Sequence, residues 1–488
     1  MRKKIIYFLF LFLLSSCGLL LPATHTLKTN QRKAEQYSKT ITQNELKKHL
    51  KIISSDEYEG RETTTIGQKK AAAYIKNHFI ENNIRSAFKD TGYYQEFPVD
   101  VLDFSKVELS YNNTKLTFID DFYPYGNPAN KNYENISIVN VGYGIINKER
   151  NDYLGKNTEG KVVFIKQGLP TDENINKKEG NWRRKVQTAS KNGAVAIVFL
   201  KSDYKNTDLR IKEYLKNPLM QLHGNQITKP LPPVFVVDEK IINELNQDSN
   251  TISFNTRVSQ TKTGENVLGY IPGLTDEIIV ISAHYDHIGY DRGEICNGAD
   301  DDGSGTSSLM SISKAFQKAF DEGNKPKRGI LFLAVSGEEK GLFGSQFYTE
   351  NPVFPLSKTI ANLNIDMVGR QDTVQQDNNY IYLIGSDRIS KELHIINETI
   401  NKEHVGFKLD YTYNALDDPN NFYQRSDHYN FAKNNIPVIF YFGGLHEDYH
   451  QPTDDYEKID FLKLERVSRF VFLTAWELAY RKKTLSKW

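Results

Sequence analysis

Hydrophobic and polar positions follow several different spacings along this chain, and each spacing predicts a different element. Apolar residues recur at helical spacing over 42–53 and again in the Ala-rich stretch 69–82. Residues 94–102 alternate between apolar and polar, which is typical of a strand. We therefore expect folded structure to begin near residue 41.

From about residue 125 to residue 257 the pattern changes to short apolar runs separated by turns rich in Gly, Asn and Lys. The predicted elements here are strands at 136–143, 161–165, 195–200 and 234–237 and a helix at 182–191. None of the candidate metal clusters falls in this region. We interpret it as an inserted module that splits a larger domain into 41–124 and 258–488.

Beyond residue 266, strand-like and helix-like segments alternate regularly. Strands are predicted at 278–283, 330–335, 360–366, 380–384 and 437–442, and helices at 304–319, 388–403, 427–433 and 461–480. This alternation predicts an α/β fold with a mixed, largely parallel sheet sandwiched by helices.

The first 17 residues form a separate pattern, with a basic start, an apolar stretch at 5–14 and then Ser15-Ser16-Cys17. The apolar stretch is too short to span a bilayer and is typical of a signal peptide. Its end resembles a bacterial lipobox, which implies that Cys17 is acylated and that 18–40 is a tether. The expected location is a bacterial cell envelope membrane, on its periplasmic or surface side. An ordinary signal peptide with an incidental Cys is the alternative.

Length, net charge and cysteine content bear on the number of domains, on a nucleic-acid partner and on disulfide bonds. The 488 residues exceed the usual size of one domain, and 62 Lys and Arg balance 61 Asp and Glu. Because the net charge is +1, nothing favours a nucleic-acid partner. If Cys17 is acylated, Cys296 has no cysteine partner left in the chain, so no intrachain disulfide is expected.

The stretch 278–305 carries the densest candidate chemistry. An apolar run of β-branched residues is followed by a loop that holds His284, Asp286, His287, Asp300, Asp301 and Asp302. Imidazoles and carboxylates together suit zinc or another divalent transition ion, because adjacent acidic residues repel one another without a cation. A solvated loop explains either feature taken alone.

Three later strand ends repeat this chemistry. Glu338 and Glu339 follow the strand that ends at Val335, Asp366 ends the next, and the last predicted strand leads to the segment 441–455. Paired carboxylates allow one to bind a metal while the other acts as a general base. The carboxyl ends of parallel strands meet at one edge of a sheet, so we expect one shared site there.

The motifs AHYDH, GADDDGSG, SGEEKGLFGS, NIDMVGR and YHQPTDD together resemble peptidase family M28, whose members are co-catalytic zinc metallopeptidases. The resemblance covers about residues 42–100 and 266–480. The inserted region separately resembles a protease-associated (PA) domain in its pattern of short strands and turns.

The resemblance implies roles for particular residues. His284 and Asp366 would bind one zinc, Glu339 and His450 the other, and Asp301 would bridge the two. Glu338 would be the general base, taking a proton from the attacking water and passing it to the leaving amine.

Two further residues receive supporting roles by the same resemblance. Asp286 would hold His284 through its second ring nitrogen, and Tyr449 would hydrogen-bond the oxyanion. The segment 425–428 resembles one that lines the substrate site, although a helix cap by Ser426 or Asp427 explains it equally well. The remaining candidates stay outside the ligand set as loop, filler or surface residues: His287, Asp300, Asp302, Cys296, His394, His404 and His446.

The function implied is an exported, lipid-anchored aminopeptidase with two Zn²⁺ per chain, acting on peptides or proteins. Carboxypeptidase-like and dipeptidase-like relatives exist. A glutaminyl cyclase-like enzyme with one zinc is the first alternative, which metal stoichiometry would distinguish. A catalytically inactive binding lipoprotein is the second, which would show no chelator-sensitive hydrolysis.

Overall fold

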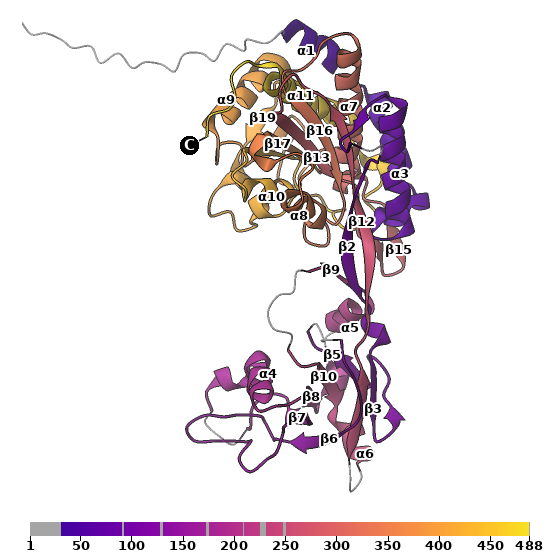
Figure 1. Ribbon diagram of the computed structural model, residues 1–488, viewed down its shortest axis with the longest axis vertical. Coiled ribbons are helices and arrows are strands. Elements are labelled where there is room, and N and C mark those ends of the chain that lie inside the picture. The colour runs from indigo at the N-terminus through magenta and orange to yellow at the C-terminus, as the bar shows by residue number, and fades with distance from the viewer. Residues whose placement is uncertain are drawn as a thin grey trace, which may run out of the picture.

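The computed structural model describes residues 31–89, 92–126, 130–171, 175–207, 209–224, 231–246 and 250–487. These residues form a larger unit of helices around a sheet and a smaller unit joined to it by long strands (Figure 1). The predicted signal segment with Cys17 lies outside the described residues. Within the described ranges, no helix combines the length and hydropathy needed to cross a bilayer.

Ten described strands form the sheet of the larger unit. In spatial order they are β19 (Lys408–Asp410), β18 (Tyr380–Ile384), β20 (Val438–Phe442), β17 (Thr359–Asp366), β13 (Ile278–His284), β16 (Gly329–Val335), β12 (Ser259–Ile271), β2 (Tyr94–Leu102) and β9 (Leu219–Leu222), with β1 (Arg85–Ser86) beside β12. The central strands β20, β17, β13 and β16 are parallel, and the strands beyond them are mostly antiparallel. The predicted mixed α/β fold is confirmed.

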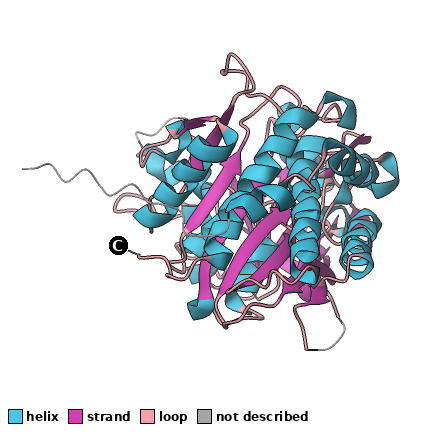
Figure 2. Cartoon of the chain, turned by 90° about the horizontal axis from the view of Figure 1, so that it is seen from above, coloured by secondary structure: helices cyan, strands magenta, loops and turns pink. Residues whose placement is uncertain are grey.

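Helices cover both faces of this sheet (Figure 2). Ile279 and Ile281 of β13 face one hydrophobic core, and Ile278 and Val280 face another. The first core is closed by α1 (Gln31–Ser38), α2 (Gln43–Ile53), α3 (Ile66–Glu81), α7 (Gly305–Asp321), α9 (Lys391–Ile400) and α11 (Phe461–Tyr480), and the second by α8 (Phe343–Glu350) and α10 (His428–Ala432). Burial on both faces explains why β13 reads as a continuous apolar run.

Helix α1 lies inside the segment predicted to be a tether. The ring of Tyr37 stacks on Trp476 with the centroids 5.6 Å apart, and its hydroxyl donates to Glu322 at 2.5 Å. The prediction of a tether is therefore wrong for residues 31–38. Only two apolar residues of this helix are buried, Ala34 and Tyr37, which is too few to give a periodic signal.

The smaller unit has a sheet and a core of its own. Its strands, in spatial order, are β4 (Thr114–Lys115), β3 (Glu108–Tyr111), β11 (Thr251–Asn255), β6 (Asn132–Asn140), β7 (Val162–Lys166), β8 (Ala196–Lys201), β10 (Val234–Asp238) and β5 (Phe122–Pro124), with helices α4 (Trp182–Lys191), α5 (Leu209–Lys216) and α6 (Glu239–Glu244). Because β3, β4 and β5 belong to this sheet, the unit begins before the predicted boundary at residue 125. Pairing between β3 and β11 is long-range and leaves no local signal.

The strands that carry the predicted site residues end on the side of the inserted unit. β12 runs from that unit into the sheet and pairs antiparallel with β16, with Val267 opposite Ala334. The stretch of β12 that precedes Val267 extends beyond the carboxyl end of β16 toward the smaller unit (Figure 1). The candidate site is thus placed at the edge of the sheet that faces the connecting strands.

Candidate functional site

Four strand ends bring the predicted residues together. His284 is the last residue of β13, Glu338 and Glu339 follow β16, Asp366 ends β17, and His450 lies in the loop after β20. Adjacent parallel strands with one common direction place these ends side by side.

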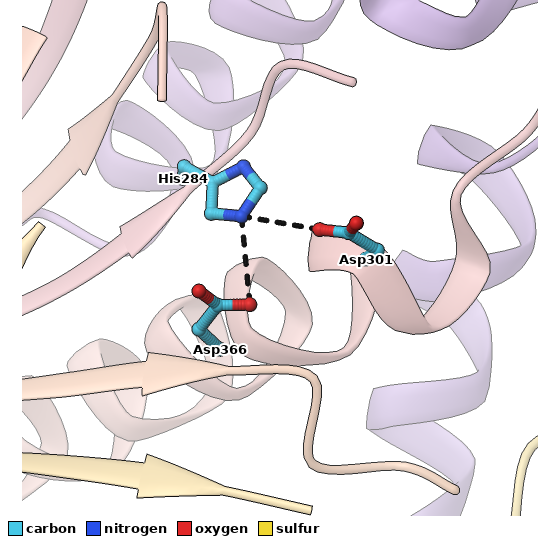
Figure 3. A group of neighbouring side chains, drawn as sticks. All are labelled: His284, Asp301 and Asp366. Carbon is cyan, nitrogen blue, oxygen red and sulfur yellow. Dashed lines mark ion pairs between the residues drawn. The ribbon is translucent and has the colours of Figure 1, made fainter. Parts of the chain in front are cut away.

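One group of possible metal donors consists of His284, Asp301 and Asp366 (Figure 3). Nε2 of His284 lies 3.3 Å from Oδ1 of Asp301 and 3.5 Å from Oδ1 of Asp366. All three residues are buried, and one donor atom of each lies within 4.8 Å of the others. This is the grouping that the resemblance to family M28 implies for one metal.

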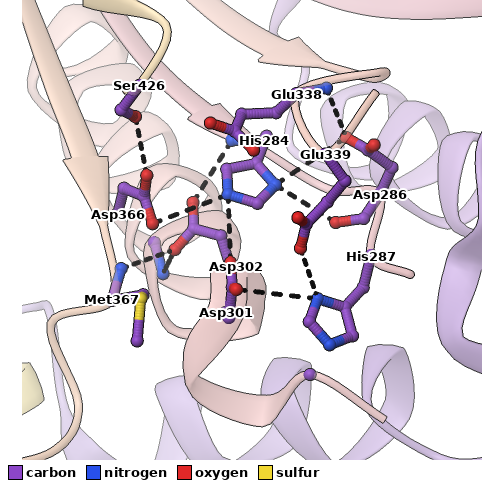
Figure 4. A network of polar contacts seen from close by, with 12 residues as sticks. His284, Asp286, His287, Asp301, Asp302, Glu338, Glu339, Asp366, Met367 and Ser426 are labelled. Atoms are coloured by element: carbon purple, nitrogen blue, oxygen red, sulfur yellow. Dashed lines mark hydrogen bonds and ion pairs between the residues drawn. The ribbon is translucent and has the colours of Figure 1, made fainter. Parts of the chain in front are cut away.

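A second group forms on the other side of Asp301. Nε2 of His450 lies 3.1 Å from Oδ2 of Asp301 and 3.0 Å from Oε2 of Glu339. His287 also joins this group, with Nδ1 2.8 Å from Oε1 of Glu339 (Figure 4). Asp301 therefore belongs to both groups, while His287 is a site residue that the sequence analysis leaves out.

The three consecutive aspartates, Asp300, Asp301 and Asp302, have different contacts: two accept hydrogen bonds from backbone N–H groups, and one faces the donor groups. The Asp302 carboxylate accepts the backbone N–H groups of Gly305 at 2.8 Å, and of Met367 and His284 at 3.2 Å. Asp300 accepts from the N–H of Gly369 at 2.6 Å. Only Asp301 of the three presents its carboxylate to both donor groups.

Asp286 supports the site differently from the predicted arrangement. Its Oδ1 is 3.7 Å from Nδ1 of His284, too far for a hydrogen bond, and that nitrogen instead lies 3.1 Å from the backbone carbonyl oxygen of Asp286. The Asp286 carboxylate accepts from Oγ1 of Thr63 at 2.9 Å and from the N–H of Glu338 at 3.3 Å. The aspartate thus orients His284 through its backbone and fixes the turn that carries Glu338.

Burial and neighbouring charges shift the pKa values of the carboxyl groups at the site in opposite directions. Burial raises the pKa of Glu338 well above its usual range, and the adjacent Glu339 adds to this against the opposing effect of His284. Burial acts the same way on Asp301, but its close contacts with the imidazoles of His284 and His450 outweigh it and hold its pKa well below the usual range. Of the two carboxyl groups, Glu338 therefore has the higher affinity for a proton and Asp301 the lower.

A chain of buried polar side chains supports Asp366 from behind. Nδ2 of Asn364 donates to Oγ of Ser426 at 2.8 Å, and that hydroxyl donates to Oδ2 of Asp366 at 2.6 Å. Asp427 accepts from Oγ of Ser345 at 2.5 Å. Helix α10 begins without a side-chain cap, so the helix-cap interpretation of Ser426 and Asp427 is wrong.

A pocket opens beside the donor groups. Its acidic wall consists of Asp301, Glu338 and Asp366, and the rest is lined by Met367, Phe422, Arg425, Phe440, Phe442, Leu445 and Tyr449. Burial raises the pKa of Tyr449, so its hydroxyl stays protonated and accepts from Nη2 of Arg425 at 3.3 Å. The arrangement suits a ligand with an apolar side chain next to a basic group.

Two basic side chains are buried near the site, and the sequence pattern does not predict this for either of them. Arg61 donates to the backbone carbonyl oxygens of Tyr285 and Ile53 at 2.7 Å, Asn297 at 2.6 Å and Gly298 at 2.9 Å, and so ties together the loops on either side of the site. His446, expected at the surface, is buried with Nε2 3.3 Å from Oδ2 of Asp300.

Buried atoms without hydrogen-bond partners show whether a cation fits. Among the described residues, Nδ1 of His287, Oε1 of Glu339 and Nε2 of His450 have no hydrogen-bond partner although each is buried. Such atoms are rare in folded proteins unless an ion or water satisfies them. Imidazole nitrogens and carboxylate oxygens at this spacing are the donors that zinc takes. The residues therefore fit a metal centre.

Comparison with known proteins shows similarity to peptidases. The model of peptidase family M28 matches residues 266–475. The aminopeptidase YwaD of Bacillus subtilis is 25% identical over 336 residues, which are 67% of this chain and 64% of that protein. A probable leucine aminopeptidase of Arthroderma benhamiae is 30% identical over 221 residues, 43% of this chain and 56% of its own length. The chain thus spans less than two thirds of these relatives.

Solved structures share the fold over nearly the whole chain. An aminopeptidase from Aneurinibacillus sp. strain AM-1 matches with a TM-score of 0.54 and 20% identity, covering 93% of this chain and 97% of its own. BSAP, a zinc aminopeptidase from Bacillus subtilis, matches with a TM-score of 0.52 and 19% identity, covering 91% and 97%. The segment 266–475, which matches the model of peptidase family M28, is the part of the chain that carries both donor groups.

Proposed function

We propose that this protein is a zinc-dependent aminopeptidase that hydrolyses the N-terminal peptide bond of peptides or proteins at a two-zinc centre. The observation that carries the proposal is the carboxylate of Asp301, which lies between two separate donor groups. His284 and Asp366 would hold one zinc, and Glu339 and His450 the other. The named aminopeptidases among the relatives support the same activity.

Zinc bound here would polarise the scissile carbonyl and lower the pKa of water, so that hydroxide forms near neutral pH. Glu338 would take the proton of the attacking water and deliver it to the leaving amine. Its place in the pocket wall, next to both Asp301 and Asp366, supports this role. Its raised pKa favours holding a proton between the two steps.

Other residues of the pocket would position the substrate. Tyr449 keeps its phenolic proton because burial raises its pKa, and would donate it to the oxyanion. Glu338 and Asp366 would attract the free α-amino group. The apolar wall, which includes Phe422 and Phe440, would receive the side chain of the first residue.

The cellular setting is proposed from the sequence. The apolar segment 5–14 and Cys17 would export the protein and anchor it by a lipid to a bacterial cell envelope membrane. The inserted unit would act as a PA-like module. Its place at the end of the long strands β2 and β12, on the side where the site opens, suggests contact with larger substrates.

A panel of aminoacyl, dipeptidyl and N-blocked fluorogenic substrates, assayed with and without a chelator, tests the activity. We expect chelator-sensitive release from unblocked aminoacyl substrates and restoration by zinc. Cleavage of N-blocked substrates alone would contradict an aminopeptidase. Failure to cleave any of the panel would favour the inactive binding protein.

Metal stoichiometry tests the glutaminyl cyclase-like alternative. We expect close to two zinc ions per chain in the purified protein. One zinc per chain, together with cyclisation of N-terminal glutamine, would favour the cyclase.

A further inference from the structure

We propose that His287 is a fourth protein donor to the zinc on the Glu339 side. The inference rests on the proposed metal centre but not on its catalytic activity. Nδ1 of His287 lies 2.8 Å from Oε1 of Glu339 and 3.8 Å from Oδ2 of Asp301, and the three residues form one of the two possible donor groups.

Four contacts among these groups have spacings close to those expected around one tetrahedral ion. Donors about 2.0–2.1 Å from a tetrahedral zinc lie about 3.3 Å from one another. The contacts from His450 to Glu339 and Asp301 are 3.0 and 3.1 Å, and those from His287 to the same residues are 2.8 and 3.8 Å. These distances bracket the expected spacing. The two imidazole rings approach edge to face with centroids 5.7 Å apart.

The contact between His287 and Glu339 is not a hydrogen bond. Although the two atoms are 2.8 Å apart, Nδ1 of His287 and Oε1 of Glu339 both lack a hydrogen-bond partner among the described residues. The pair therefore lacks the geometry of a hydrogen bond, and both buried atoms are left without a polar partner. A cation there would satisfy both.

The loop is shaped to hold this ring in place. His287 is fully buried, and Nε2 also has no hydrogen-bond partner among the described residues. Gly298 lies against the ring with a positive φ of 56°, and a Cβ at that position would come within 2.5 Å of Cγ of His287. Gly298 thus provides the space that the imidazole occupies.

The two sides of the centre are then unequal. The Glu339 side has four protein groups, namely His287, His450, Glu339 and the shared Asp301, whereas the other side has three, His284, Asp366 and Asp301. Four protein ligands are typical of closed, tightly held zinc, and three leave a position for water or substrate. We infer that the Glu339 side binds zinc more tightly and that substrate binds on the His284 side.

Zinc titration of the metal-free protein against a chromophoric chelator tests this. Wild type should show two classes of site. His287→Ala and His287→Gln should each weaken the tighter class by at least about 100-fold, beyond the 10- to 100-fold loss typical of removing an outer hydrogen-bond partner. The matched control is His428→Gln. His428 is equally buried and its ring nitrogens have no hydrogen-bond partner among the described residues, yet it belongs to neither donor group.

Retention of the tight class in His287→Gln would overturn the inference, because glutamine can hydrogen-bond Glu339 but is a poor zinc ligand. Circular dichroism of each metal-free variant confirms that it is folded. Because no substrate is present, these affinities are independent of hydrolysis. A protein without peptidase activity whose His287 variants lose tight zinc binding would support the inference while contradicting the proposed function.

Discussion

The hydroxyl of Ser426 donates a 2.6 Å hydrogen bond to Oδ2 of Asp366, which leaves Oδ1 of that carboxylate directed at His284. The two residues come from different segments, since Asp366 ends β17 and Ser426 lies two residues before the first residue of α10. A partner of this kind fixes the orientation of a metal-binding carboxylate before the metal arrives.

Ser426→Ala is therefore expected to weaken zinc binding on the His284 side by about 10- to 100-fold and to leave the Glu339 side unchanged. Chelator competition resolves the two sides. Ser345→Ala is the matched control, because Ser345 donates to Asp427, a carboxylate that is in neither donor group. Equal weakening in both variants would mean that general loosening of the fold is responsible.

Glu338→Gln is expected to keep the zinc content of wild type and to lower turnover by about 100- to 10,000-fold, the usual contribution of a general base. Glu338 belongs to neither donor group, so its substitution removes proton transfer without removing a ligand. Measured zinc content and initial rates on an aminoacyl substrate check this. Near wild-type turnover would exclude Glu338 as the base.

Substitutions of Asp301 and of Asp366 should differ in the number of zinc ions that the protein loses. Asp301→Asn is expected to lose tight binding on both sides, because the Asp301 carboxylate lies in both donor groups, whereas Asp366→Asn should affect only the His284 side. Metal analysis after dialysis distinguishes one retained zinc from none. Retention of two zinc ions by Asp301→Asn would show that this carboxylate does not bridge.

Zinc binding should weaken as the pH falls. In the metal-free protein burial lowers the pKa of His450, but the carboxylates of Asp301 and Glu339 outweigh it and raise the pKa to about 10. Zinc must displace that proton, so between about pH 6.5 and 8.5 the affinity of the Glu339 side should fall about tenfold for each unit that the pH falls. A pH-independent affinity would contradict this.

The same shift predicts how the stability of the metal-free protein depends on pH. The folded pKa of His450 lies above the unfolded value of 6.5, so its ion pairs stabilise the fold fully below about pH 6.5. This contribution is lost as the pH rises through about 10. Denaturant unfolding in the presence of chelator, comparing wild type with His450→Gln, should show a difference that shrinks with rising pH.

Arg61→Met is expected to lower the free energy of unfolding by about 3–5 kcal/mol, because it leaves several buried carbonyl oxygens without donors. Denaturant unfolding of the metal-free protein measures the change. The exposed Arg292, which pairs with its neighbour Asp291, is the control, and Arg292→Met should stay within about 0.5 kcal/mol of wild type. Similar losses in both variants would exclude a special role for Arg61.

Local pattern predicts most elements of the larger unit. Helix α11 and strand β18 occupy the predicted residues, because a long 3.6-residue period and a doubly buried apolar run are both local signals. The start of the inserted unit is not predictable this way. Strands β3 and β5 are short, and what assigns them to that unit is pairing with β11 and β10, more than a hundred residues later.

The sequence by itself determined the alternating fold and the convergence of four acidic or histidine-bearing strand ends, whereas the choice of Asp301 within the triplet came from the resemblance to family M28. Only the tertiary structure decided that His287 faces Glu339, that Asp286 holds His284 through its backbone, and that Ser426 and Arg61 support the site. The physical reason is that spacing along the chain fixes which strand end a residue occupies. Its contacts depend on loops that meet across the sheet edge from distant segments.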